Sequence, residues 1–541
     1  MLSTFFGMEI ARRGLLSSRT AMDVTAHNLA NASTKGYTRQ DPVFTATDPY
    51  TLPGAWQKLL PGQIGSGVEV SQIRRVRDGI LDQQVRGALG EDGFWSERQD
   101  ALQRVEAVFP EPSDVGLGDV IGRFFNAWHE LNNSPTDPGL KAAVKELGQE
   151  LAVNFRHTYT QLKDIKGSLQ QSIDLKVDQI NAIVRELAGL NKEIARIVAN
   201  GNQPNDLLDR RDLLLDELNG LVPVQVMVNK DETINVSLKY YDGSGNEQQQ
   251  SLVVYDGSYY QLKAVVDNSN NNDELKLDVY DQYGIQVTDG GTPVSINWTE
   301  SSESFKLSGS LAGVENARRR VQDYMDQLDQ LAYGLAAYVN NLHHDKYDSK
   351  GNLITQDDQN NGVYKGVDFF ALNAPTYDPG NNTDDNSLND SIDYKTYIQF
   401  STDKGSEYVN YVKGYAGKID LSDKIKSDVN NVNGTQALNI ARLRTELTMA
   451  DTAGKLTATF EAFYRGLVAG VGADAQGADH QVGTTQAVLN QLENLRQSVS
   501  GVSLDEELTR LTQFQYAFQA SARMVTVLDD MLDTLINRMA V

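Results

Sequence analysis

The C-terminal 38 residues carry an amphipathic pattern that no glycine or proline interrupts. Apolar side chains recur at steps of three and four from residue 504 to residue 539, which predicts one helix roughly 54 Å long. Ser503 and Glu506 predict a capping box at its start. We expect the stripe to be a packing surface, and its members are Leu504, Leu508, Leu511, Phe514, Phe518, Val525, Leu528, Leu532 and Leu535.

The other end of the chain predicts a second, thinner amphipathic helix over residues 3–32. Its apolar side contains Met8, Ala11, Leu15, Met22 and Leu29. The first 40 residues have a net charge of +3, whereas residues 504–541 have a net charge of −3. Opposite charges favour association of the two ends, with each other or with neighbouring subunits. Two independent surface helices remain the alternative.

Between these ends the periodicity predicts a helical frame interrupted by two insertions. The expected fold class is multidomain α+β, with coiled-coil-like terminal helices, a discontinuous helical domain and β-rich insertions. We predict an axial helix and extended segment at 1–76, a helical domain assembled from 77–222, 310–344 and 436–500, a β-rich insertion at 223–309, a variable acidic or β insertion at 345–435, and a C-terminal axial helix at 501–541.

Changes of pattern set these boundaries. Val224, Val226 and Val228 alternate with polar residues directly after Pro223, which is typical of a strand. Residues 345–395 contain ten Asp and four Lys, a net charge of −6, together with eight Asn. Such a segment predicts loops or irregular β structure, followed by extended runs near 397–400 and 408–412.

Composition excludes several classes of function. The 541 residues include 49 Lys and Arg against 73 Asp and Glu, a formal charge of −24, so neither nucleic acid nor an anionic membrane is an expected partner. Cysteine is absent, which removes disulfides, thiol catalysis and cysteine–zinc sites. No run approaches the ~20 apolar residues of a membrane span. Gly7 and Glu9 interrupt the N-terminal apolar run, so a cleaved signal peptide is not expected.

No catalytic or cofactor-binding motif stands out, and we predict no enzyme activity, no cofactor and no metal. His343 and His344 are adjacent and diverge on a helix, which disfavours a shared metal. Residues 345–352 lack the terminal Glu of a calcium loop and fit a turn better. The basic runs at 74–77 and 318–320 are expected to pair with carboxylates of the same chain.

Both ends resemble the axial proteins of the bacterial flagellum. Residues 30–40, ANASTKGYTRQ, look like the N-terminal signature of rod, hook and hook-associated proteins. Three runs look like their C-terminal signature: SLDEEL at 503–508, QYAFQASAR at 515–523 and MLDTLI at 531–536. The motif positions that carry the resemblance are Asn31, Gly36, Tyr37, Gln519, Ala520, Ser521 and Arg523.

The interior narrows the resemblance to the members at the hook–filament junction. GLGDV at 116–120, FFNAW at 124–128, NSPTDP at 133–138 and NDLLDRRD at 205–212 are similar to the helical domain of those proteins, and Asp368-Phe369-Phe370 also fits. The similarity covers roughly residues 1–225, 310–345 and 436–541. The two insertions match in position only.

This resemblance implies a structural role in which the chain joins hook to filament as a self-assembling axial ring. The implied partners are copies of itself, hook protein, the next hook-associated junction protein and a cytoplasmic export chaperone on the C-terminal helix. The implied location is the extracellular flagellum, reached by type III export without a cleaved signal peptide. Another axial protein, such as hook or rod protein, is the main alternative. Two alternatives from other functional classes are an enzyme and an adhesin, either of which would be carried in the insertions.

Overall fold

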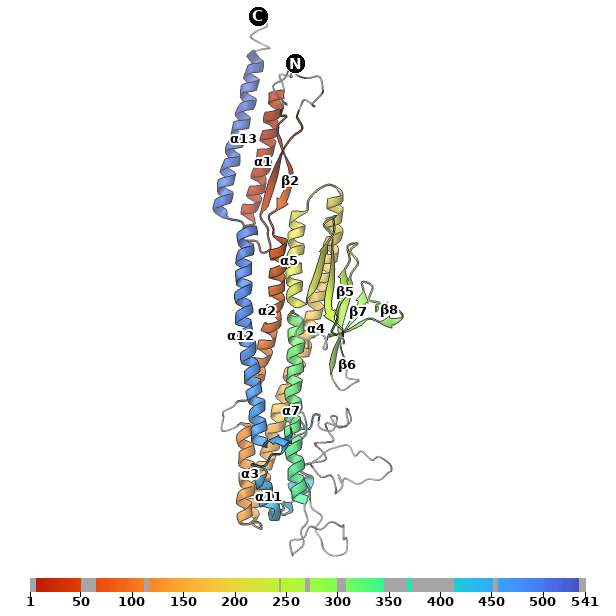
Figure 1. Ribbon diagram of the computed structural model, residues 1–541, viewed down its shortest axis with the longest axis vertical. Helices are drawn as coiled ribbons and strands as arrows, with labels where there is room; N and C mark the ends of the chain where they lie inside the picture. The colour runs from red at the N-terminus through yellow and green to blue at the C-terminus, as the bar shows by residue number, and fades with distance from the viewer. Residues whose placement is uncertain are drawn as a thin grey trace.

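The computed structural model describes residues 6–49, 65–110, 116–242, 245–267, 273–298, 308–344, 367–371, 413–450 and 456–534. Its helices run along one long axis, and small sheets lie to one side (Figure 1). This arrangement confirms the predicted fold class, a helix-rich multidomain α+β protein.

Long helices build the body of the molecule. They are α2 (Gly79–Glu106), α3 (Leu117–Asn133), α4 (Pro138–Ala199), α5 (Asn205–Leu221), α7 (Ser310–His344) and α12 (Phe460–Ser500). Asp78 caps α2 by accepting from the backbone N–H groups of Ile80 and Leu81. Asp137 caps α4 in the same way, and Pro138 occupies the first turn, where no N–H is needed. Helix α12 packs along α2 and also contacts α7.

An aromatic cluster closes the end of the body where α3 lies. Phe124, Trp128 and Phe369 are fully buried, and the ring centroids of Trp128 and Phe369 are 5.4 Å apart. Phe370 is equally buried beside them. Residues 367–371 therefore belong to the packed body, although they lie between stretches of chain outside the described residues.

The β-rich insertion forms two antiparallel three-stranded sheets beside α4 (Figure 1). The first contains β3 (Val224–Val228), β4 (Ile234–Tyr241) and β5 (Glu247–Val253). The second contains β6 (Tyr260–Asp267), β7 (Glu274–Asp281) and β10 (Ser295–Asn297), and β8 (Thr288–Asp289) pairs with β9 (Thr292–Pro293). Along β4, Ile234, Val236 and Leu238 alternate inward as a strand requires. Asn191 of α4 binds the backbone of Ile234 in both directions.

The two ends of the described chain form a separate unit at one tip. It contains α1 (Phe6–Ala30), the hairpin of β1 (Gln40–Ala46) and β2 (Val68–Arg75), and α13 (Leu504–Asp533). The hairpin is antiparallel, with a register shift between Val43 and Phe44. It packs against α1.

The region before α12 is less regular than the sequence predicts. Its short elements are α10 (Asp423–Ser427), η1 (Val429–Asn431), η2 (Gly434–Gln436), α11 (Ala437–Arg442), β11 (Met449–Ala450) and β12 (Leu456–Ala458). Residues 436–459 therefore contain a two-stranded hairpin where continuous helix is expected, since Thr448 and Ala458 pair through their backbones. The predicted turn at 345–352 and the extended runs at 397–400 and 408–412 lie outside the described residues.

Candidate functional site

Helices α1 and α13 lie side by side at the tip of the molecule and run in opposite directions (Figure 1). Near the start of α1, a Cβ on Gly7 would lie 3.3 Å from Leu528 Cδ1. Near its end, Asn28 donates a hydrogen bond to Glu507 over 3.0 Å. Residue numbers therefore rise on one helix as they fall on the other, and the two helices keep one register along their contact.

The face that α1 turns toward α13 is made of small residues. A Cβ on Gly14 would lie only 3.0 Å from the Ser521 hydroxyl oxygen, so the two backbones approach closely there. The same face, read at steps of four and three, contains Gly7, Ala11, Gly14, Ser18, Ala21, Thr25 and Asn28. Small side chains on one helix leave room for large ones on the other.

Helix α13 supplies the large side chains of this seam. The half-buried residues that follow the line of contact are Leu511, Phe514, Phe518, Ser521, Val525, Leu528 and Leu532. They alternate in steps of three and four, which is the spacing of a coiled-coil stripe. The structure therefore brings most of the predicted C-terminal stripe onto α1, while Leu535 lies outside the described residues.

Leu504 and Leu508 differ from the expected packing. They are 52% and 48% exposed. No residue of α1 lies opposite Leu504, because Glu507 already faces Asn28 near the end of α1. Leu508 is one step past Glu507 and so turns away from the seam. The expected capping box is also absent, since the Ser503 side chain makes no cap bond.

The predicted apolar stripe of α1 divides into two faces. Ala11 is buried, whereas Met8, Leu15, Met22 and Leu29 are half-buried. These four larger residues are spaced by seven and therefore share a face of their own, roughly 60–100° around the helix from the small-residue positions. The sequence pattern assigns Ala11 to the same stripe as the four larger residues because alanine counts as apolar. Its real neighbours on the small-residue face are glycine and serine, which do not count as apolar.

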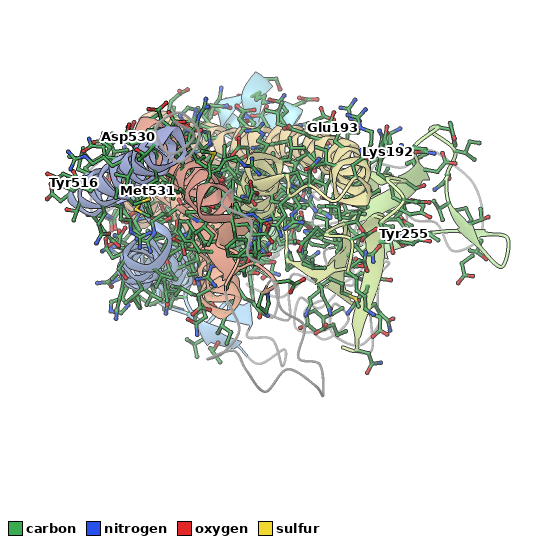
Figure 2. The ribbon with its side chains drawn as sticks, turned by 90° about the horizontal axis from the view of Figure 1, so that it is seen from above. Lys192, Glu193, Tyr255, Tyr516, Asp530 and Met531 are labelled. Atoms are coloured by element: carbon green, nitrogen blue, oxygen red, sulfur yellow. The ribbon has the colours of Figure 1, made fainter. Side chains whose placement is uncertain are left out.

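A second apolar row remains uncovered on α13, and we call it the outer face. It consists of Tyr516, Met524, Val527 and Met531, with exposed fractions of 68%, 53%, 45% and 57%. Figure 2 shows Tyr516 at the left edge of the molecule and Met531 on the same helix, both far from the sheets around Tyr255. Large apolar residues gathered on one exposed face are typical of an interaction surface.

Asn28 is a hub that the sequence pattern does not single out. Its side-chain oxygen accepts from the Tyr37 hydroxyl and from the Gln40 backbone N–H. Its side-chain nitrogen donates to the Gln40 carbonyl and to Glu507. Asn28 and Glu507 are each 1% exposed. One available indication was the position of Glu507, seven residues before Phe514 and therefore in phase with the seam.

The motif residues of the family resemblance have different structural roles. The Asn31 backbone and side-chain nitrogens both donate to the His27 carbonyl, which ends α1. Gly36 has a φ of 82° and lies over Leu213 of α5. Burial raises the pKa of Tyr37, with nearby carboxylates adding to the effect, so its hydroxyl remains a donor to Asn28. Ser521 lies in the seam, whereas the remaining motif positions of α13 are exposed: Gln519, Ala520 and Arg523.

The described part of the chain offers packing surfaces more clearly than a reaction centre. Within it, no group of three or more His, Asp or Glu side chains could hold a metal ion. No described helix is both long enough and apolar enough to cross a membrane. His343 lies buried and its ring accepts from the Asn433 backbone N–H, so it belongs to the packing of the body.

Family models match both components of this terminal unit. A model for flagella basal body rod protein matches residues 8–38, and a model for the C-terminal part of flagellar basal body rod FlgEFG protein matches residues 496–539. The first segment covers α1 from Met8 onward, and the second contains all of α13. The matches define the class of the chain, which is that of the axial proteins of the flagellum.

The interior identifies the family within that class. A model for the helical domain of flagellar hook-associated protein FlgK matches residues 102–357. Flagellar hook-associated protein 1 of Bacillus subtilis is 31% identical, over 100% of this chain and 99% of the relative. Its counterpart in Salmonella typhimurium is 26% identical, over 97% and 98%. The chain therefore belongs to the flagellar hook-associated protein 1 family, and it is a structural component of the flagellum at the hook–filament junction.

A solved structure agrees with this fold. The flagellar hook junction protein FlgK from Burkholderia pseudomallei superimposes with a TM-score of 0.55 at 17% identity, covering 77% of this chain and 100% of that one. The main alternative, a hook or rod protein, is not supported, because the helical-domain match and the full-length relatives belong to the hook-associated family.

Proposed function

We propose that the terminal unit is the assembly site by which copies of this chain form a short axial ring. Hook protein adjoins the ring on one side and the next hook-associated junction protein on the other. The observation that carries the proposal is the outer face of α13, which is apolar and uncovered in the described chain. Burying such a row between subunits is favourable, at about 25 cal/mol for each Å² of apolar surface removed from water.

The geometry favours neighbours that meet head to tail. Helix α1 offers its row of larger residues, Met8 to Leu29, on one side of the unit, while α13 offers a different row, Tyr516 to Met531. Two unlike surfaces on one subunit generate a ring when the rotation between copies closes. The opposite net charges of the two terminal segments support the same pairing.

The role is structural, and neither nucleic acid, a membrane nor a cofactor takes part in it. Before assembly, a cytoplasmic chaperone covers α13, and the chain leaves the cell by type III export with an uncleaved N-terminal signal. The exposed outer face supports this part of the proposal, because an apolar row on an unassembled chain is an aggregation hazard. The chain then functions outside the cell, in the flagellum.

Charges on the outer face test the proposal. Met524→Glu with Met531→Glu should leave the isolated chain folded, because both side chains are exposed, yet should abolish filament attachment and motility. The matched control is Thr512→Glu with Thr526→Glu, which adds the same charge on an exposed polar row of the same helix. Circular dichroism, thermal melting and swimming assays provide the readouts. Normal swimming with Met524→Glu and Met531→Glu would refute the outer face as an assembly surface.

A further inference from the structure

Helix α5 presents a row of carboxylates toward the terminal unit. Asp206, Asp209, Asp212 and Asp216 follow one another at steps of three and four, which places them along one side of the helix. Their segment includes the NDLLDRRD run, to which neither the sequence nor the assembly proposal gives a physical role. We call this set the carboxylate row.

The turn after α1 sits on this row through hydrogen bonds. The Thr38 backbone N–H donates to Asp209 over 3.0 Å, and the Gln40 side-chain amide donates to Asp206 over 3.0 Å. Asn205, at the start of α5, donates to the Gln40 side-chain oxygen over 3.1 Å. The segment that links α1 to β1 is therefore fixed to α5 by side chains and backbone together.

The end of β2 sits on the row through ion pairs. Arg75 contacts Asp209 over 2.9 Å and Asp212 over 2.7 Å. Arg77 reaches Asp212 over 2.5 Å and also binds Asp82 at the start of α2. The side chains of Arg75, Asp209 and Asp212 are only 13%, 7% and 10% exposed, so solvent screens these pairs weakly.

The charges in this contact are mutually dependent. Burial alone would raise the pKa of Asp212, but Arg211, Arg77 and Arg75 hold it below its usual range. Removing one partner of such a pair leaves the other buried without compensation, which is strongly destabilising. The ion pairs also fix the relative orientation of β2 and α5, because a planar guanidinium binds carboxylates in a defined direction.

Apolar packing does not replace these contacts. The main apolar core of the described residues contains buried side chains from Phe94 to Ala478, and none from α1, β1, β2 or α13. Interfaces of this polar kind permit relative motion of the joined parts unless specific contacts prevent it. The orientation of the terminal unit therefore depends on what the polar contacts allow.

We propose that the carboxylate row of α5 is a polar seat that fixes the direction of the α1/α13 pair relative to the body. Asp209 and Asp212 act as positioning residues, with Arg75 as the group that they hold. The proposal concerns the isolated chain and goes beyond the assembly role of the outer face.

The absence of cysteine allows a direct distance measurement. Glu193→Cys on α4 and Tyr516→Cys on α13 place spin labels at two exposed positions, and Figure 2 shows these residues well apart from each other. Double electron–electron resonance on the full-length labelled chain then reports how sharply the terminal unit is oriented. We expect one narrow distance distribution from the parent protein.

Adding Asp209→Asn and Asp212→Asn should replace the narrow distribution by a broad one, while the main thermal transition persists. The matched control is Glu186→Gln, which breaks a pair with Arg210 of α5 whose side chains are 44% and 50% exposed. It should leave the distribution narrow. Should the double variant fail to fold, Arg75→Gln provides the test, because Asp212 then keeps Arg77 and Arg211. If the distance distribution stayed narrow in the folded Asp209→Asn/Asp212→Asn or Arg75→Gln variants, the proposed positioning role would be wrong. The proposed assembly role of the outer face would not be affected.

Discussion

At the residue scale, single polar side chains hold backbone segments that lie outside the named helices and strands. Asp329 of α7 accepts from the backbone N–H groups of Gly414 and Ala416 over 2.6 and 2.8 Å. Asn340, further along the same helix, accepts from Phe369 and Phe370 over 2.9 Å each. Such contacts do not depend on the side chains of the segment that is held, because they bind only its backbone N–H groups.

The pH dependence of stability should reveal Asp329. Its burial raises its pKa to about 7, against backbone donors and Lys413 that lower it, with Asp326 adding to the rise. Between about pH 4 and pH 7 the folded chain thus holds a proton that the unfolded chain has lost, so the free energy of unfolding falls as pH rises. The total fall is on the order of 4 kcal/mol.

Asp329→Asn should flatten this slope, because the amide does not titrate. Denaturant unfolding at pH 5 and pH 8 measures the difference. Asp505→Asn, at an exposed position of α13, is the control and should follow the parent protein. If the free energies of unfolding of the parent protein and of Asp329→Asn differed by the same amount at both pH values, the raised pKa of Asp329 would be contradicted.

At the element scale, the seam between α1 and α13 combines one small face with one large face. Leu528 lies against Gly7, and Leu532 occupies the next seam position. Replacing both by Glu places two charges in an apolar contact, at a cost on the order of several kcal/mol. We expect Leu528→Glu with Leu532→Glu to separate α13 from α1, to leave the body folded and to abolish filament attachment.

Limited proteolysis and thermal melting of the purified variant distinguish this outcome from general unfolding. Met524→Glu with Met531→Glu is the comparison, because it adds the same charge to the same helix outside the seam. It should keep α13 resistant to protease. Motile cells carrying the seam variant would exclude this pairing as part of the assembled state.

The elements show which features the sequence could predict. The C-terminal stripe from Leu511 to Leu532 follows from periodicity alone, because large apolar side chains mark every seam position except Ser521. The seam of α1 does not, since Gly14 and Ser18 pack closely yet count as polar or neutral in any apolar pattern. Asn28 and Glu507 were likewise missed, because a buried polar pair is visible only when both partners are placed.

Helix lengths and tertiary contacts needed the structure as well. The sequence predicts helical structure over 77–222, but it does not show that one helix, α4, extends over 62 residues from Pro138 to Ala199. The sequence alone does not show where the carboxylates of α5 lie. Asp209 and Asp212 are buried because Arg75 and Arg77, at and just after the end of β2, pair with them, a contact across more than a hundred residues that no local pattern encodes.

At the scale of the whole molecule, the chain on either side of residues 372–412 is anchored to α7. The Ala371 N–H donates to the Asp420 carbonyl over 2.8 Å, so the two flanks also meet each other. Loop-closure cost grows only slowly with length when the ends are held together. The intervening residues lie outside the described part of the chain.

We predict that replacing residues 375–392 by a short Gly/Ser linker preserves both the melting temperature and motility. Asn340→Ala should instead lower the stability by about 2–3 kcal/mol, because it leaves two buried backbone donors unpaired. Thermal melting of both variants and swimming of cells that carry them test this contrast. A large fall in melting temperature with the linker would mean that the replaced segment packs against the body.

The antiparallel pairing of α1 with α13 also imposes an order of events during biosynthesis. Gly7 meets Leu528, so this contact closes a loop of roughly 520 residues, which ranks among the most non-local contacts of the chain. At typical elongation rates a chain of this length takes on the order of a minute to synthesise. Helix α1 is translated before the rest of the described chain, yet it must wait for α13 throughout that interval. Within the described chain, the terminal unit therefore contains the helix that is translated first and can be completed only after the last one.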